Sequence, residues 1–314
     1  MSRPRLPYRA AIVAGLAAAS SSGAAQTLTN PVDQKLACDR ITHQYEAARK
    51  PVEGRLLNEF LFDASGRGCV DLAKTFLELG ASVKARDRFG NSALSIAARM
   101  GRRSVAILLI SEGADANHRN LAGTSVLLRA ATQRRRAIAR LLLIHGADPN
   151  VPNHRGVTPL IAASFSGDRR TVEALLAAGA NPGVRDATGK GPVVYAAGRG
   201  FKRIVTLMLD ENLDADAIYG NNLTGLMWAA GHSNDVPEGD GLETVELFLA
   251  RNVDVNRVDD RGRTALMIAA ERGHSKIVSR LLEVGASANH KDKEGNTALD
   301  LAANASVRAA LGRQ

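Results

Sequence analysis

Residues 259–291 read DDRGRTALMIAAERGHSKIVSRLLEVGASANHK, and this stretch decides the fold. Gly262 can adopt the positive φ of a tight turn, and the hydroxyl of Thr264 can cap a helix that follows it. Apolar residues then recur at helical spacing over 266–270 and over 277–282, with a glycine between the two runs that can end a helix. The stretch therefore predicts one turn followed by two short helices.

The same unit is copied along the chain. Its turn glycine returns every 33 residues, and Asn222 takes one of these positions. The glycines are Gly90, Gly123, Gly156, Gly189, Gly262 and Gly295. A fixed period of this length is typical of a solenoid, in which each repeat packs only on its neighbours. The step from Asn222 to Gly262 is 40 residues, so one repeat carries an insertion near 231–241.

Three short motifs identify the repeat. Gly-x-Thr-Pro-Leu occurs at 156–160, Gly-Ala-Asp-x-Asn closes the units at 113–117 and 146–150, and paired alanines recur in the first helices. In these motifs and in its period the unit resembles the ankyrin repeat. The resemblance implies an all-α repeat solenoid, a helix-turn-helix stack with short β-hairpin-like turns. About seven to eight repeats, including caps, would cover residues 56–314.

Two departures from the ankyrin pattern carry expectations. The family's histidine after the first-helix leucine is absent from every copy, so we expect apolar packing to carry more of the stacking between repeats. Arg134 stands where the sister repeats have a glycine between their two helices, which predicts a less regular turn there.

Residues 1–25 have the layout of a cleavable secretory signal peptide. Arg3, Arg5 and Arg9 precede an apolar block over 10–19, and small residues follow at 23–25. Its removal lowers the formal net charge from +9 to 9 − 3 = +6. An organellar transit peptide is the alternative. The expected location is periplasmic or secreted, and the chain resembles exported bacterial ankyrin repeat proteins of the periplasm.

The two cysteines, Cys38 and Cys69, belong to the part of the chain near its N-terminus, where residues 26–55 form an extension before the repeats. In an oxidising compartment the pair can close a disulfide that tethers this extension. Two buried free thiols acting as small hydrophobic groups are the alternative.

Motifs that carry catalysis are absent from the sequence. It has no Gly-x-Ser-x-Gly, no His-Glu-x-x-His and no phosphate-binding glycine loop, and its seven histidines are scattered. We therefore expect neither an enzyme, nor a cofactor, nor a metal site, nor a small-molecule substrate; a cryptic active site is a remote alternative. The acidic insertion is interpreted as a solvated loop, with a partner contact or a cation site as alternatives. Trp228, which precedes it, is interpreted as a core residue.

The functional prediction is a surface. In the ankyrin family the turns and the first helices form a concave groove that holds a protein partner. Here this geometry places a basic set of residues along the groove: Arg88, Phe89, Arg99, Met100, Arg119, Leu121, Arg155, Phe165, Arg185, Lys190, Arg199, Arg261, Arg263 and Arg272.

This basic groove predicts a non-catalytic scaffold for protein–protein interaction whose partner has an acidic surface. A second hypothesis is binding to an anionic polymer or a membrane surface, with nucleic acid only if the protein is not exported. The plain alternative is that these arginines only keep the protein soluble.

Overall fold

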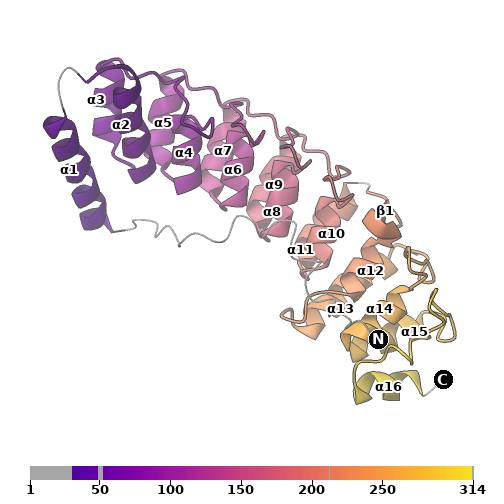
Figure 1. The fold of residues 1–314 in the computed structure, drawn as a ribbon. Coiled ribbons are helices and arrows are strands. Elements are labelled where there is room, and N and C mark those ends of the chain that lie inside the picture. Colours follow the sequence, from indigo (N-terminus) through magenta and orange to yellow (C-terminus); the bar gives the residue numbers. More distant parts are fainter. Residues whose placement is uncertain (1–29, 49–51, 212, 313–314) are drawn as a thin grey trace, which may run out of the picture.

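The computed structural model describes residues 30–48, 52–211 and 213–312, which form an extended stack of helix pairs (Figure 1). The candidate signal peptide at 1–25 lies outside the described residues. Each repeat contributes a first helix, an inter-helix turn, a second helix and a hairpin turn that leads to the next repeat.

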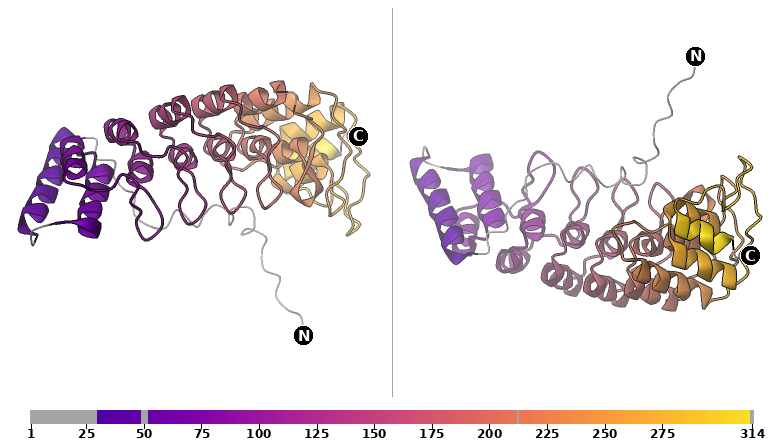
Figure 2. Two further views of the ribbon diagram at one scale, coloured as in Figure 1. Left: turned by 90° about the horizontal axis from the view of Figure 1, so that it is seen from above. Right: turned by 90° about the horizontal axis from the view of Figure 1, so that it is seen from below.

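The helices lie in two rows. First helices are α2 (Gly54–Arg67), α4 (Ala93–Met100), α6 (Val126–Thr132), α8 (Pro159–Phe165), α10 (Pro192–Ala197), α12 (Gly225–Ala230) and α14 (Ala265–Arg272). Second helices are α3 (Val70–Glu78), α5 (Arg103–Ser111), α7 (Arg136–Ile144), α9 (Arg169–Ala177), α11 (Lys202–Asp210), α13 (Glu238–Leu249) and α15 (Ser275–Glu283). First helices pack on first helices and second on second, and the hairpin turns project from one side (Figure 2). The predicted all-α solenoid is confirmed.

Hydroxyl caps start most of the first helices. Ser92, Ser125, Thr158, Thr224 and Thr264 each accept a hydrogen bond from the backbone N–H three residues ahead, at 3.1–3.3 Å. Each cap satisfies one of the N–H groups that a helix leaves unpaired at its start. The predicted role of Thr264 is confirmed.

The hairpin turns share one construction. The periodic glycines have φ between 71° and 85°, and Asn222, which takes one of their positions, has φ 58°. One Asp or Asn in a turn accepts hydrogen bonds from the N–H groups two and four residues ahead, as Asn153 does from Arg155 and Val157. In one hairpin the turn is completed by a two-residue strand pair, β1 (Ile218–Tyr219) with β2 (Leu223–Thr224), around the 3-10 turn Gly220–Asn222.

Successive hairpin turns are joined through their backbones. The N–H of Leu121 donates to the carbonyl of Phe89 at 3.0 Å, and the N–H of Ala187 donates to the carbonyl of Arg155 at 2.8 Å. The turns approach so closely that a Cβ added to Gly156 would lie 2.9 Å from the backbone nitrogen of Ala187. The side chains at the turn tips are therefore carried on a continuous, hydrogen-bonded edge.

Polar side chains link neighbouring repeats by hydrogen bonds. Asn117 donates to the carbonyl of Gly146 at 3.0 Å and accepts from the N–H of Asp148 at 2.8 Å. A histidine elsewhere in the repeat, His118, places Nε2 2.7 Å from the carbonyl oxygen of Gly90. The expectation that apolar packing carries more of the stacking stays a prediction, and asparagine and histidine side chains at other positions add polar bridges between neighbouring repeats.

The inter-helix turn at Arg134 is as regular as its sister turns. Arg134 has φ 53°, whereas the corresponding Gly101 and Gly167 have φ 76° and 69°. The prediction of a less regular turn is therefore wrong. The arginine adopts the left-handed conformation in place of glycine, at a cost of about 1–2 kcal/mol for a residue with a Cβ atom.

Arg134→Gly should therefore raise the free energy of unfolding by about 0.5–1 kcal/mol, since relief of the backbone strain exceeds the extra entropy of the unfolded chain. Denaturant unfolding measures this change. Gln133→Gly is the matched control, because Gln133 has φ −94° and should lose stability when replaced by glycine. A variant Arg134→Gly no more stable than the wild type would contradict the strain.

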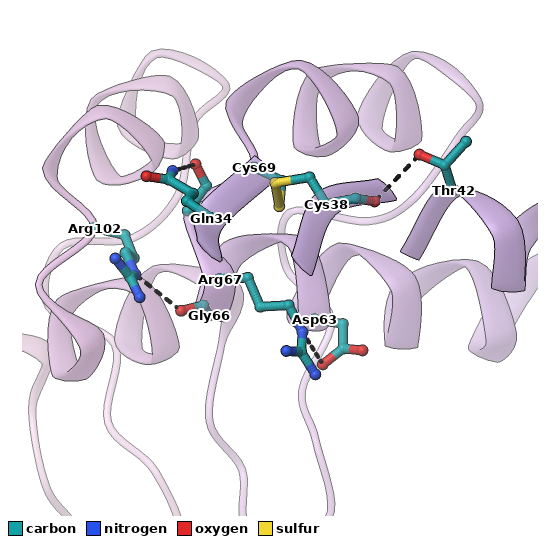
Figure 3. The surroundings of a disulfide bond; sticks show 9 residues. Gln34, Cys38, Thr42, Asp63, Gly66, Arg67, Cys69 and Arg102 are labelled. Atoms are coloured by element: carbon teal, nitrogen blue, oxygen red, sulfur yellow. Dashed lines mark hydrogen bonds and ion pairs between the residues drawn. A yellow bond between two sulfur atoms is a disulfide. The ribbon is translucent and has the colours of Figure 1, made fainter. Parts of the chain in front are cut away.

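The helix α1 (Pro31–Ala47) caps the stack at its N-terminal end (Figure 1). A disulfide joins Cys38 in α1 to Cys69, which precedes α3, with the two Cα atoms 5.7 Å apart (Figure 3). Gln34 also donates to the carbonyl of Gly68 at 2.8 Å. On the same helix Ile41 is buried, and Tyr45 packs its ring against two phenylalanines of the first helix pair. At the other end, α16 (Ala305–Leu311) packs on α15.

Candidate functional site

The hairpin turns and the first helices together form one face of the stack, which we call the inner face. The predicted partner-binding residues lie in the hairpin turns or in first helices, except Arg199, which lies in the inter-helix turn after α10. Exposed are Arg88, Phe89, Arg99, Arg119, Leu121, Arg155, Arg185, Arg199 and Arg261, while Met100, Phe165, Lys190, Arg263 and Arg272 are half-buried. The structure thus brings the predicted set onto one surface.

Two of these arginines hold the turns together. Arg119 donates to the carbonyls of Gly123 and Pro152, at 3.1 and 2.9 Å. Arg263 forms a two-point ion pair with Asp259 and a further bond to Glu271, and its side chain is only 17% exposed. Arg119 and Arg263 thus hold the turns through contacts within the protein, and their predicted role in partner binding stays a prediction.

Four other cations of the predicted set stack on aromatic rings. Arg88 lies 4.7 Å from the ring centre of Phe89, and Arg185 lies 4.9 Å from that of Tyr219. These distances are typical of cation–π contacts, which leave the N–H edge of the guanidinium available to a partner. Two apolar side chains at neighbouring turn tips are also exposed: Phe89 at 55% and Leu121, in the next turn, at 71%.

The other two stacked cations belong to a row that crosses three repeats. Arg199 lies 4.9 Å from the ring centre of Phe165, and Lys190 lies 6.0 and 5.2 Å from the rings of Tyr195 and Trp228. Phe165 and Tyr195 meet edge to face at 5.7 Å. We call these residues, Phe165, Lys190, Tyr195, Arg199 and Trp228, the cation–aromatic row.

The row is held in place from behind. The hydroxyl of Tyr195 donates to Asp186 at 2.5 Å, and burial together with this carboxylate raises the pKa of Tyr195. Burial likewise raises the pKa of Tyr219 to about 12, although the adjacent Arg185 lowers it. Both phenols therefore stay neutral at physiological pH, and the cations stacked on them are not neutralised by a phenolate.

Sequence reasoning missed two members of the row. The sequence pattern does not point to Tyr195, and it predicts Trp228 to be a core residue. Trp228 does pack against the core, but it is only half-buried and also lines an open cavity. Both residues immediately precede the paired alanines of their first helices, at 196–197 and 229–230. That position faces inward in α10 and α12, so a large residue before the alanine pair is the sequence signal that could have identified them.

A cavity of about 310 Å³ opens on the inner face between α12, α14 and the hairpin turns that precede them. Its apolar wall is formed by Leu223, Met227, Trp228 and Ile268. Its polar rim contains Lys190, Asn221, Asp259, Asp260, Arg261, Arg263, Glu271 and Arg272, with Gly231 at the end of α12. Concave sites with an apolar wall and a few polar groups are typical binding sites.

The insertion at 231–241 is exposed over most of its length, in line with the interpretation as a solvated loop, but some of its residues are anchored on a neighbouring repeat. His232 is 1% exposed and stacks on His274 of the next repeat, with ring centres 3.9 Å apart. Glu238 accepts a hydrogen bond from the N–H of Lys276 at the start of α15. Burial lowers the pKa of His274, which favours a neutral ring in this stack. The insertion therefore joins two repeats, and its acidic residues face outward only in part.

Within the described parts of the chain, no cluster of three or more His, Cys, Asp or Glu side chains is placed to bind a metal ion. The described helices include none that is long and apolar enough to span a bilayer.

Comparison with known proteins gives the family. A family model for ankyrin repeats (3 copies) matches residues 61–153, 160–238 and 236–311. The chain belongs to the ankyrin repeat family. Membership supports a protein–protein interaction scaffold and implies protein partners, on a fold that is typically non-catalytic.

Three relatives share parts of the repeat region. Identity is 35% over 79 residues with the 60 kDa lysophospholipase of Mus musculus, 36% over 96 residues with the Ankyrin repeat and KH domain-containing protein mask of Drosophila melanogaster, and 43% over 63 residues with Protein HOS4 of Saccharomyces cerevisiae. These stretches cover 25%, 30% and 20% of this chain but only 13%, 2% and 6% of the relatives. The similarity is therefore to a small part of each relative.

Proposed function

We propose that this protein is a scaffold that binds an acidic segment of a partner protein along its inner face. The observation that carries the proposal is the stacking of Arg185, Lys190 and Arg199 on aromatic rings. A stacked cation is held in one orientation, so it loses less side-chain entropy when a carboxylate binds it. Aromatic and arginine side chains are also the residues that most often dominate binding at interfaces.

The test is charge reversal on the inner face with a matched reversal elsewhere. The double variant Arg185→Glu/Arg199→Glu should weaken partner binding at least about tenfold, because the partner's carboxylates would meet like charges. The control is Arg170→Glu/Arg203→Glu, two exposed arginines near the starts of α9 and α11 in the second-helix row. It makes the same change in net charge on the other side of the repeats.

Partners captured by the wild type are identified, and their affinities for the three proteins are then measured with purified components at two salt concentrations. Equal loss in both double variants would overturn the proposal, because it would indicate general attraction to polyanions rather than a defined surface. Unchanged affinity in the inner-face variant would overturn it as well.

We further propose that the protein acts in an oxidising compartment outside the cytoplasm, such as a bacterial periplasm. The arrangement of residues 1–25 and the Cys38–Cys69 disulfide support this location, because disulfides persist mainly in exported proteins. Expression of the full chain followed by determination of the mature N-terminus tests it. Cleavage near Gln26 is expected, and an intact N-terminus on a cytoplasmic protein would contradict it.

A further inference from the structure

Two consecutive repeats have glycine directly after the paired alanines of the first helix, and one of them, Gly231, lines the cavity beside Trp228. Gly198 and Gly231 have φ −65° and −98°, which any residue can adopt, so their backbone conformation does not require glycine. Space does. A Cβ on Gly231 would lie 2.7 Å from a methyl carbon of Ile268, and one on Gly198 would lie 3.3 Å from the Trp228 ring.

Sister repeats fill the same position. The residues there are Arg99, Thr132, Phe165 and Glu271, each with a side chain that occupies the inner face. Because Gly231 has no side chain there, Trp228 and Ile268 both reach the cavity and line it. With about 310 Å³, the cavity is at the lower end of the range for small-molecule sites, a size that suits one large side chain.

Two cations on the rim of the cavity, Lys190 and Arg272, have no carboxylate beside them in the described parts of the chain. Among the described residues, no carboxylate lies within 4.0 Å of the charged groups of Lys190 or Arg272. Arg263 binds both Asp259 and Glu271, so these three residues together keep one negative charge. With the exposed Asp260, the rim has three carboxylates against four cations, Lys190, Arg261, Arg263 and Arg272.

We propose that this cavity, bounded by Trp228, Met227 and Ile268 and rimmed by Lys190 and Arg272, binds one aromatic or large aliphatic side chain of a partner peptide whose neighbouring residues are acidic. The inference rests on the proposed function, because it names the anchor within the acidic segment that the inner face binds. The apolar wall takes up the side chain and the unpaired cations receive the flanking carboxylates. The partner is thus recognised by an acid–apolar–acid sequence rather than by charge alone.

Selection from a random library of twelve-residue peptides displayed on phage tests the cavity and the inner face separately. Wild-type protein should enrich peptides with an aromatic or large aliphatic residue between acidic residues. Trp228→Ala should still enrich acidic peptides but lose the preference for the apolar residue. Arg185→Glu/Arg199→Glu, which leaves the cavity lining unchanged, should lose the acidic enrichment.

Acidic enrichment without an apolar position in the wild-type selection would overturn the cavity and leave the proposed function standing. Selections without acidic enrichment would overturn the proposed function itself.

A selected peptide then permits a direct measurement. Trp228 is the sole tryptophan of the chain, so its fluorescence reports occupation of the cavity. Binding should shift the emission, and replacing the apolar residue of the peptide by alanine should weaken binding about 10- to 100-fold. Arg272→Gln should weaken binding of the intact peptide, whereas Arg170→Gln, on the second-helix row, should not. A peptide that binds with unchanged Trp228 emission and tolerates the alanine replacement would overturn the proposal.

Discussion

Replacing Cys38 and Cys69 together by serine should release α1 from the repeat stack. The disulfide closes a loop with a sequence separation of 31 residues. On the chain-entropy model a loop of about 30 residues is stabilised by about 3–4 kcal/mol. Because the end of a solenoid contacts only one neighbour, this loss should fall on the N-terminal cap and not on the whole protein.

Amide hydrogen exchange is the measurement. Amides of α1 should exchange about 100- to 1,000-fold faster in Cys38→Ser/Cys69→Ser than in the wild type, while amides of α8 and α14 keep their protection. The remaining contacts of α1, through Gln34, Ile41 and Tyr45, are few. Reduction of the wild type must reproduce the effect, and the double variant must not respond to reductant. Unchanged protection of α1 would show that these contacts alone hold the cap.

The periodic part of the fold could be predicted from sequence because its determinants are local. The φ preference of glycine fixes each hairpin turn, and a hydroxyl such as that of Thr264 fixes the start of a helix. Arg134 shows the limit of such reasoning. The neighbouring helices impose the left-handed turn on a residue that does not prefer it, because packing on both sides outweighs about 1–2 kcal/mol of backbone strain.

The candidate site was less predictable because it depends on which side chains meet across repeats. The basic residues of the inner face follow from the repeat register, but the engagement of Arg263 by Asp259 and Glu271 depends on distances that spacing alone does not give. The cavity is harder still to predict from sequence, since it depends on the absence of a side chain at Gly231 next to a large one at Trp228. Neither residue alone indicates a cavity.

The insertion illustrates a similar limit. Its composition, rich in acidic residues and glycine, is typical of a solvated loop, yet the stack of His232 on His274 fixes it between two repeats. Close approach is again the cause, because a Cβ on Gly241 would lie 2.0 Å from the ring of His232.

Phe248→Ala should be the most damaging single substitution in the repeats that carry the cavity. Phe248 on α13 is 1% exposed, and its ring lies against Gly225 at the start of α12, the helix that carries Trp228. Removal of a buried phenylalanine ring costs about 3–5 kcal/mol through lost burial and the cavity left behind. Denaturant unfolding is followed by circular dichroism and by Trp228 fluorescence. Both transitions should shift to lower denaturant concentration, and the fluorescence transition should shift at least as far as the other. Leu249→Ala is the control, since this half-buried neighbour should cost less.

The fit between the two residues can be tested in the reverse direction. A Cβ on Gly225 would lie 2.3 Å from Cε1 and 2.6 Å from Cζ of Phe248, so Gly225→Ala should destabilise by about 1–3 kcal/mol through overpacking. In Gly225→Ala/Phe248→Leu the obstructing ring atoms are gone, and the double variant should be more stable than the sum of the two single losses predicts. Strictly additive losses would mean that the ring does not rest on Gly225, and that something other than this contact holds α12 and its tryptophan against the second-helix row.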